Sequence, residues 1–407
     1  MKARYQYRFY PTDQQRQSLA QLFGCVRVVW NDALSICKQF QKLPKNSDLQ
    51  KLVITQAKKT AEREWLSDVS VTPLQQSVAD LGVAYKNFFD SLKGRRKGSK
   101  VGSPKFKKKV GKQSARFTLN SFSIKGDEVY LAKIGNVKPI WSRSLPSAPS
   151  SVTVIKDAAG RYFLSFVVEV IQIQVLPTNP SIGIDLGLTH LAITSDGDKY
   201  SNPQHFAKHQ RNLKRKQQKL SRKQKGSNSR QKARLKVAKV HAKISRCRED
   251  FLHKLSRKIV NENQVIAVEN LGVKNMVRNH KLAKLISDCG WGMFGTMLKY
   301  KAEKEGKTYQ EVDRFFPSSK TCHVCLNQVS SLPLDVRSWT CEHCQTTHDR
   351  DINAAVNIKN EALRILSLGT SDTASLRGCQ SPEQTSVSSD AIPVDARSPH
   401  LLVEKCG

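Results

Sequence analysis

The chain has 407 residues, with 68 Lys or Arg against 34 Asp or Glu, so its formal net charge is +34. This length allows two or three domains, and the positive excess is more than a soluble enzyme of a small metabolite needs. A polyanion partner explains the charge, because each Lys or Arg that meets a phosphate releases condensed counterions. A generally basic surface is the alternative, but the charge is clustered rather than spread.

The N-terminus has no apolar signal core, and the longest apolar stretch, 163–176, is interrupted by polar residues. We therefore expect no membrane span and no membrane partner. Ten cysteines without a signal peptide indicate a reducing compartment, which we take to be the cytoplasm of a bacterium or archaeon. Four of them form two CxxC pairs, and the other six have no ligand spacing.

The first ninety residues are predicted to form one strand followed by a helical insertion. Alternate residues of 4–10 are aromatic, which is typical of a strand with one buried face. Thr12 and Gln15 then fit a capping box at the start of a helix. Helical spacing continues to Trp65 and again over 73–92.

Residues 93–112 form a basic loop that contains four glycines and places Phe106 among lysines. A basic loop with an aromatic residue suits a phosphate backbone and a stacked base. A solvated linker is the alternative, although a linker does not need this charge density. The candidate nucleic-acid contacts in the loop are Lys105, Lys107, Lys108 and Lys109.

Strands are expected from 117 to 176, including a hairpin around a turn at 157–160, and 177–180 resembles a domain boundary. Residues 208–248 contain no Asp or Glu, and GSNS at 226–229 divides them into a basic helical hairpin. Its candidate nucleic-acid contacts are Lys214, Arg215, Lys216, Arg222 and Lys223. A later helix is expected from about Ser287 to Gly306, and a disordered tail follows residue 366.

Three carboxylates stand out because each lies at the end of an apolar element. Asp185 and Glu269 end the buried strands of SIGIDLGL and QVIAVENL, and Asp351 lies near the start of the helix DINAAVNI. An acid in such a place is costly unless it is paired or binds a metal. Taken singly, each could equally be a helix cap or a structural ion pair.

Together, the three acids are typical of a hard-metal site. Carboxylate oxygens without neighbouring His or Cys ligands favour Mg²⁺ or Mn²⁺ over zinc. Two such ions can activate a water and stabilise the leaving oxygen of a phosphodiester. Asp349 competes for the third position, but it would more naturally cap the helix that begins beside it, leaving Asp351 to face the other two acids.

Two CxxC pairs, Cys322 with Cys325 and Cys341 with Cys344, are separated by fifteen residues, which is a zinc-ribbon spacing. Four thiolates close the tetrahedron, so the expected zinc is structural. Two disulfides are the alternative. Leu326 stands where such knuckles usually have Gly or Asn, and it could strain the turn without removing a ligand.

The motifs GIDLGL, AVENL and HDRDINAAVNI resemble the three RuvC motifs of the TnpB family, which are transposon-encoded RNA-guided nucleases related to type V CRISPR effectors. Similarity extends to YRFYPTDQQ, GSPKFKKK, ISDCGWGMF and FFPSSKTCHVC, and so covers most of the chain to about Arg364. By motif match, the resemblance implies that Asp185, Glu269 and Asp351 hold the catalytic metal and that the four cysteines hold zinc. It implies a guide RNA from the element's end and double-stranded target DNA as partners.

The resemblance implies an α+β multidomain fold. A wedge β-domain resembling an oligonucleotide-binding barrel takes 1–10 and 117–178, and a helical recognition insertion with the basic loop takes 11–116. An RNase H-like RuvC domain takes 181–315 and 345–366, interrupted by a zinc ribbon at 316–344. The disordered tail takes 367–407.

Two other functions use parts of the same pattern. A DNA-binding transposase, or an accessory protein of transposition, also cuts with three acids in an RNase H-like domain. A non-catalytic zinc protein could bind nucleic acid and repress genes, although it would have no reason to keep three buried acids. The zinc module inserted before Asp351 favours the RNA-guided endonuclease.

Overall fold

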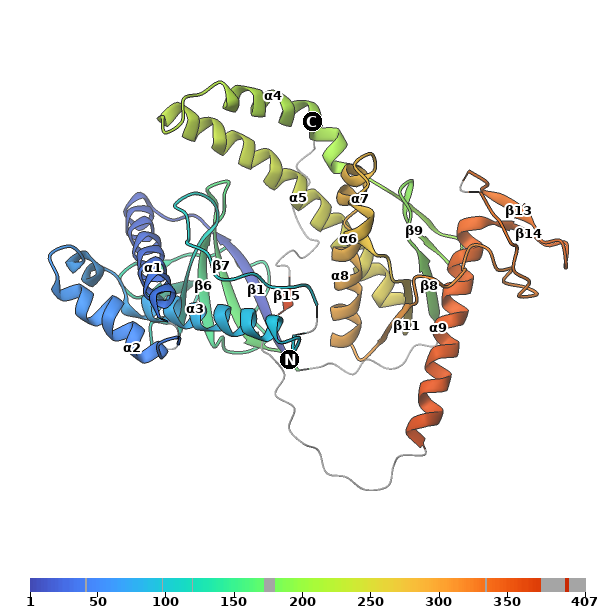
Figure 1. The fold of residues 1–407 in the computed structure, drawn as a ribbon, viewed down its shortest axis with the longest axis horizontal. Coiled ribbons are helices and arrows are strands. Elements are labelled where there is room, and N and C mark those ends of the chain that lie inside the picture. The colour runs from blue at the N-terminus through green and yellow to red at the C-terminus, as the bar shows by residue number, and fades with distance from the viewer. Residues whose placement is uncertain are drawn as a thin grey trace. The chain divides into compact units, whose positions relative to one another are not determined.

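The computed structural model describes residues 1–40, 42–96, 98–118, 120–171, 180–333, 335–374 and 392–394. The chain divides into two compact units, Met1–Val170 with 389–407, and Ile171–Ser388. Both units combine β-sheets with α-helices, so the fold is mixed α and β and multidomain (Figure 1). No helix in the described ranges is long and apolar enough to cross a membrane.

The first unit is built on a five-stranded sheet with the order β15-β1-β7-β6-β2. All its pairs are antiparallel except β15 with β1. A separate three-stranded antiparallel sheet has the order β3-β4-β5. The strands are β1 (Lys2–Phe9), β2 (Gln113–Thr118), β3 (Phe122–Lys125), β4 (Glu128–Leu131), β5 (Gly135–Val137), β6 (Ser151–Lys156), β7 (Tyr162–Glu169) and β15 (Ile392–Val394).

Two local predictions for this unit are confirmed, the buried aromatic face of β1 and the capping box of α1. The aromatic residues of β1 face the core, with Tyr7 and Phe9 almost fully buried. The Thr12 hydroxyl accepts from the backbone N–H of Gln15, whose side chain accepts in return, so the capping box is present. The helices are α1 (Asp13–Gln39), α2 (Asn46–Gln50) and α3 (Val71–Leu92), with short helical turns over 51–56, 57–59 and 64–68.

The second unit is built on a five-stranded sheet with the order β10-β9-β8-β11-β12. The pairs β10–β9 and β9–β8 are antiparallel, while β8–β11 and β11–β12 are parallel. A two-stranded sheet, β13-β14, stands apart. The strands are β8 (Ser181–Asp185), β9 (His190–Thr194), β10 (Lys199–Ser201), β11 (Val265–Glu269), β12 (Thr308–Val312), β13 (Ser338–Thr340) and β14 (Thr347–Asp349).

Six helices connect and cover these strands in the described part of the unit: α4 (His205–Ser221), α5 (Asn228–Glu262), α6 (Val273–Met276), α7 (Ala283–Cys289), α8 (Trp291–Lys304) and α9 (Arg350–Ala374). Helix α9 lies against β8 (Figure 1). A Cβ on Gly183 would lie 2.0 Å from the carbonyl oxygen of Ala355. Only glycine therefore lets α9 approach β8 this closely.

The predicted basic hairpin is confirmed as α4 and α5. Leu213 of α4 packs on Val240 and Ile244 of α5, which gives the hairpin a small core of its own. The Ser227 hydroxyl caps α5 by accepting from the backbone N–H of Arg230. The Arg230 guanidinium donates to two carbonyls at the end of α4 and in the turn, so the turn is held on both sides.

Several boundaries differ from those expected. Strands begin at Gln113 rather than 117, and the helix expected from Ser287 is two helices, broken at Gly290, whose φ is 71°. The ribbon's second strand, β14, continues past 344 to Asp349, and α9 extends past 366 to Ala374. The tail prediction otherwise falls mainly on 375–391 and 395–407, outside the described residues, as does most of the predicted boundary at 177–180.

Candidate active site and cysteine cluster

Asp185 and Glu269 end two neighbouring strands of the second unit. Strands β8 and β11 are parallel, and Ile184 is paired with Val268. The next residue on each strand is the acid, so the two carboxylates lie side by side at the carboxyl edge of the sheet. Both residues are half-buried.

Asp351 reaches the same edge from the first turn of α9. The pKa of Asp185 is raised to about 7, first by burial and then by the negative charges of Glu269 and Asp351. The Leu186 backbone N–H and the Arg350 charge offset part of this rise. Burial also raises the pKa of Glu269. The negative charges of Glu269 and Asp351 therefore lie close enough to Asp185 to disfavour its ionised form.

The three carboxylates, unlike the four cysteines, do not form a ready-made group of metal ligands in the described residues. Among the residues that the structure describes, the four cysteines are the group of candidate ligands that could hold a metal ion as placed, with their sulfur atoms within 4.8 Å of one another. Their metal-binding role is therefore supported by placement and charge, not by a closed ligand shell.

Asp349, the competing acid, caps α9. Its Oδ1 accepts from the backbone N–H groups of Asp351 and Ile352, each at 3.1 Å. Its Oδ2 accepts from the Lys199 ammonium at 2.6 Å. Burial acts to raise the pKa of Asp349, but the Lys199 and backbone hydrogen bonds outweigh it and lower that pKa. The arrangement is the one expected if Asp349 caps the helix and Asp351 faces the other acids.

The raised pKa of Asp185 predicts a pH dependence of stability. Between its usual value of 3.8 and about 7, the folded state holds a proton that the unfolded chain releases. The free energy of unfolding of the magnesium-free protein should therefore fall as the pH rises through this window. Urea midpoints in magnesium-free buffer measure it. The slope should be smaller in Asp185→Asn, and an unchanged slope there would contradict the assignment.

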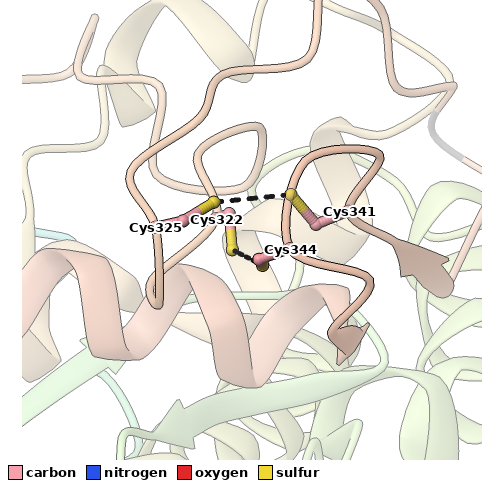
Figure 2. A group of neighbouring side chains, drawn as sticks. All are labelled: Cys322, Cys325, Cys341 and Cys344. Carbon is pink, nitrogen blue, oxygen red and sulfur yellow. Dashed lines mark hydrogen bonds between the residues drawn. The ribbon is translucent and has the colours of Figure 1, made fainter.

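The four cysteines form a compact group (Figure 2), with their sulfur atoms within 4.8 Å of one another. The Sγ atoms of Cys322 and Cys344 are 3.6 Å apart, as are those of Cys325 and Cys341. A tetrahedral Zn–S distance of ~2.3 Å gives sulfur separations of ~3.8 Å, whereas a disulfide bond is ~2.04 Å. All four thiols are free, so the group fits a zinc ion and the disulfide alternative is not supported.

The charges of the thiols also favour a cation among them. Hydrogen bonds from the Thr346 hydroxyl and backbone lower the pKa of Cys344 to about 6. At Cys325 the Asn327 backbone favours the thiolate, but desolvation and hydrogen bonds with the other three thiols raise its pKa to about 12. Full ionisation of the group therefore needs a compensating positive charge.

Each pair of cysteines lies in a tight knuckle. The backbone N–H of Leu326 donates to the Cys322 carbonyl, and that of Gln345 donates to the Cys341 carbonyl, each at 2.9 Å. The φ angles of Leu326 and Gln345 are 62° and 56°, in the left-handed region. The strain expected at Leu326 is therefore present, and Gln345 shares it in the second knuckle.

Two asparagines that the sequence analysis missed join the knuckle to α9. The side-chain amides of Asn353 and Asn357 donate to the carbonyl of Thr321 at 2.8 and 2.6 Å, and both also reach the carbonyl of Ser318. The Asn353 carbonyl oxygen accepts from the backbone and ring of His323. Both asparagines are almost fully buried. We call Asn353 and Asn357 the amide clasp.

Substitution within the amide clasp should weaken metal binding. Asn353→Asp or Asn357→Asp replaces a donor with a carboxylate that repels the loop carbonyls, so zinc affinity should fall ~10–100-fold. Competition with a chromophoric chelator measures this affinity. Asn360→Asp is the matched control, because Asn360 lies on the same helix and is exposed. Equal affinities in all three variants would rule out a role for the clasp.

Two arginines, also missed, contact the ribbon and the start of α9. The buried Arg350 donates to the carbonyl of Pro333 at 2.6 Å and, through its backbone, to that of Arg337 at 2.9 Å. The exposed Arg337 guanidinium lies 3.5 Å from Asp351. His348 is buried beside the cluster, with Nε2 3.1 Å from the Cys322 sulfur. The ribbon thus holds the turn that carries Asp351.

The predicted nucleic-acid contacts occupy different environments. Lys107 packs against other residues of the first unit. Its ammonium lies 3.8 Å from the centre of the Trp30 ring, and its backbone makes two hydrogen bonds with the Asn31 side chain. Burial lowers its pKa, with Asp80 opposing. Lys105, Lys108 and Lys109 are exposed, and so are Lys214, Arg215, Arg222 and Lys223 of the hairpin, while Lys216 is half-buried.

Three family models match this chain. "Probable transposase" matches 165–280, which contains Asp185 and Glu269. "Cas12f1-like, TNB domain" matches 291–358, which contains the four cysteines and Asp351. "Helix-turn-helix domain" matches 1–42, which forms β1 and α1 in the structure.

Solved structures resemble the chain only weakly. The chain in a Cas12f1–sgRNA–target DNA complex is 15% identical, with 85% of this chain and 81% of that chain covered and a TM-score of 0.48. CasPhi-2 (Cas12j) bound to crRNA is 8% identical, with 89% and 98% covered and a TM-score of 0.44.

Curated relatives are much more similar. A protein from Escherichia coli K12, "Putative RNA-guided DNA endonuclease InsQ", is 29% identical over 387 residues, 90% of this chain and 93% of its own. One from Streptomyces pristinaespiralis, "Putative RNA-guided DNA endonuclease", is 42% identical over 372 residues, 88% of this chain and 89% of its own. With that identity over nearly the whole length, the chain belongs to the same family, the TnpB family.

Proposed function

We propose that this protein is an RNA-guided DNA endonuclease encoded by a transposable element. It hydrolyses phosphodiester bonds of target DNA at a metal site held by Asp185, Glu269 and Asp351. The observation that carries the proposal is the convergence of these three acids at one sheet edge, in a chain 42% identical to a relative named for this activity. Its partners are a guide RNA from the element's end and double-stranded target DNA.

The three acids would hold Mg²⁺ or Mn²⁺, which supplies the Lewis acidity for activating water and stabilising the leaving oxygen. Asp349 fixes the first turn of α9 by accepting its backbone N–H groups, and so aims Asp351 at the edge of the sheet. The raised pKa of Asp185 means that it binds a cation best once deprotonated. Cationic side chains around the carboxyl edge of the sheet would then bind and orient the substrate.

The order β10-β9-β8-β11-β12, with its mixed directions, supports the RNase H-like assignment of the RuvC domain at 181–315 and 345–366. The ribbon at 316–344 would hold one structural zinc. In the first unit, the strands of 1–10 and 117–178 would form the wedge domain, resembling an oligonucleotide-binding barrel, and 11–116 the recognition insertion. These domain roles are supported by the motifs and the strand pairing.

The test of the proposed function is a change of guide. Protein purified from cells should carry RNA, and cleavage should depend on that RNA. The RNA is removed and replaced with one whose guide sequence is redesigned, and cleavage is compared on old and new targets. We expect cleavage to move to the new target, because base pairing carries long sequence specificity in guided nucleases. Unchanged target choice would overturn the proposal.

A transposase, or an accessory protein of transposition, is the second candidate, and the family match over 165–280 favours it. Both candidates use the same acids, so loss of activity on substitution does not separate them. A strand-transfer assay does. Joined DNA products would favour the transposase, whereas hydrolysed ends alone would favour the endonuclease.

The basic hairpin should contribute sequence-independent affinity for nucleic acid. Replacing Lys214, Arg215, Arg222 and Lys223 with Gln removes four exposed charges and leaves the hairpin core of Leu213 unchanged. Binding should weaken for all sequences alike, and the slope of log K against log salt should shrink by ~0.7–0.9 per lost contact. Titrations at several salt concentrations measure this. An unchanged slope would exclude phosphate contacts here.

A further inference from the structure

A cavity of about 180 Å³ lies beside Glu269 in the second unit, on the side of α8 and β12. Its apolar lining includes Leu186, Val268 and Leu271. Its polar lining includes Lys299, Tyr309 and Glu311, and the Tyr309 hydroxyl donates to Glu311 at 3.2 Å. The cavity thus combines an apolar surface with a few hydrogen-bonding groups, which is the usual composition of a ligand site.

One wall of the cavity is a face of α8 that is nearly free of bulky side chains. Gly292, Gly295 and Thr296 lie on it, one or two turns before Lys299. Glycine destabilises a helix interior relative to alanine. Yet a Cβ on Gly292 would meet no atom within 4 Å, so packing within the chain does not require glycine there. The absence of a side chain at Gly292 leaves open space in the cavity.

Trp291 also lines the cavity and is 3% exposed. Its indole N–H is buried and meets no acceptor among the described residues. Buried donors are nearly always satisfied, and this one belongs to a residue that lines the cavity, although the nitrogen itself lies behind the cavity surface. Rotation of the Trp291 indole ring toward the cavity would bring its N–H to an acceptor on a bound ligand.

Size and position limit the ligand. Sites for drug-sized ligands measure ~300–1,000 Å³, so this cavity suits a smaller planar group such as a single nucleobase. Glu269 belongs both to the cavity lining and to the proposed catalytic acids, so a nucleotide next to the cleaved phosphodiester is close to it. An enzyme whose guide chooses the sequence must accept any base there, and apolar contact with a base is sequence-tolerant.

We propose that this cavity receives the base of one nucleotide that flanks the cleaved phosphodiester, and so positions that bond at the three acids. The inference rests on the proposed endonuclease function. Lys299 contacts the backbone of the same nucleotide, and Trp291 and Tyr309 contact the base. The cavity is a positioning site and takes no part in bond breaking.

The first experiment uses the full chain with its guide RNA and Mg²⁺. Cleavage positions are mapped on an intact target, and single abasic nucleotides are then placed in turn on either side of each position. One abasic position should slow cleavage by about 5- to 150-fold, the range that corresponds to losing a base contact. Neighbouring abasic positions should have much smaller effects. A flat profile would overturn the inference.

The second experiment fills the cavity with Gly292→Leu, and separately with Thr296→Phe in case the first variant folds poorly. Either substitution should slow cleavage of the intact target by a similar factor. At the sensitive position, the abasic nucleotide should then cause no further slowing, because the base has already been displaced. Asn360→Leu is the matched control, since Asn360 is helical and exposed and does not line the cavity.

The outcomes separate this inference from the proposed function. Absence of guided cleavage by the unmodified protein would contradict the proposed function itself. If the unmodified protein cleaves as guided but the abasic nucleotide slows a cavity-filling variant as much as it slows the unmodified protein, the base site is rejected. The proposed endonuclease function then still stands. Guide-RNA binding should be unchanged in every variant, and its loss would show that the cavity serves the RNA instead.

Discussion

Replacing Asp185, Glu269 or Asp351 with Ala should abolish DNA cleavage while leaving guide-RNA and target binding nearly intact. Each acid is proposed to hold the catalytic metal, and metal stabilisation of the transition state amounts to several kcal/mol. The cleavage rate should therefore fall by at least ~1,000-fold. Single-turnover cleavage in Mg²⁺, together with filter binding of guide and target, measures both quantities.

Two other acids serve as controls for this result. Asp196→Ala removes an exposed carboxylate at the turn after β9 and should leave cleavage unchanged. Asp349→Ala removes the cap of α9, which costs ~1 kcal/mol of stability, and should reduce cleavage far less than Asp351→Ala. Full activity in Asp351→Ala with loss in Asp349→Ala would mean that the third ligand is Asp349.

Replacing Cys322 or Cys344 with Ser should release zinc and disorder the ribbon. Structural zinc contributes ~10–16 kcal/mol of binding free energy in small zinc domains, and a Ser hydroxyl replaces a thiolate ligand poorly. Because the ribbon contacts α9 through Asn353 and Arg350, cleavage should be lost together with the metal. Elemental analysis and proteolysis of the ribbon measure the two effects.

Cys247→Ser is the matched control for this substitution, because Cys247 is a free thiol on α5, outside the cluster. It should retain about one zinc per chain and normal cleavage. Elemental analysis that found no zinc in freshly purified, reduced wild-type protein would contradict the ribbon assignment. Zinc retained in Cys322→Ser with the ribbon intact would contradict the assigned ligand.

The sequence predicted best where local chemistry decides the structure. The Thr12 capping box, the 157–160 hairpin turn and the two cysteine knuckles each depend on residues a few positions apart, and all are present. The carboxylates at strand ends were also found, because an acid after an apolar run is unusual whatever the tertiary fold. Asp349 could be separated from Asp351 because an acid at the start of a helix is expected to cap it.

What the sequence did not predict depends on contacts between distant segments. In the run KFKKK nothing distinguishes Lys107 from its neighbours, since its partners Trp30 and Asn31 lie 76 or more residues earlier. Asn353 and Asn357 resemble ordinary polar residues of a helix until the loop carbonyls that they bind are known. The break at Gly290 did have a local signal, a glycine before Trp291, and was overlooked.

The position of the ribbon between β12 and α9 has a consequence for protein synthesis. Asp185 and Glu269 leave the ribosome first, but the helix that carries Asp351 follows only after both cysteine knuckles have been made. The face of β8 at Gly183 also stays uncovered until α9 arrives. A nascent or prematurely terminated chain therefore holds two acids without the third. The proposed metal site is therefore incomplete until the ribbon and the first turn of α9 have both been synthesised.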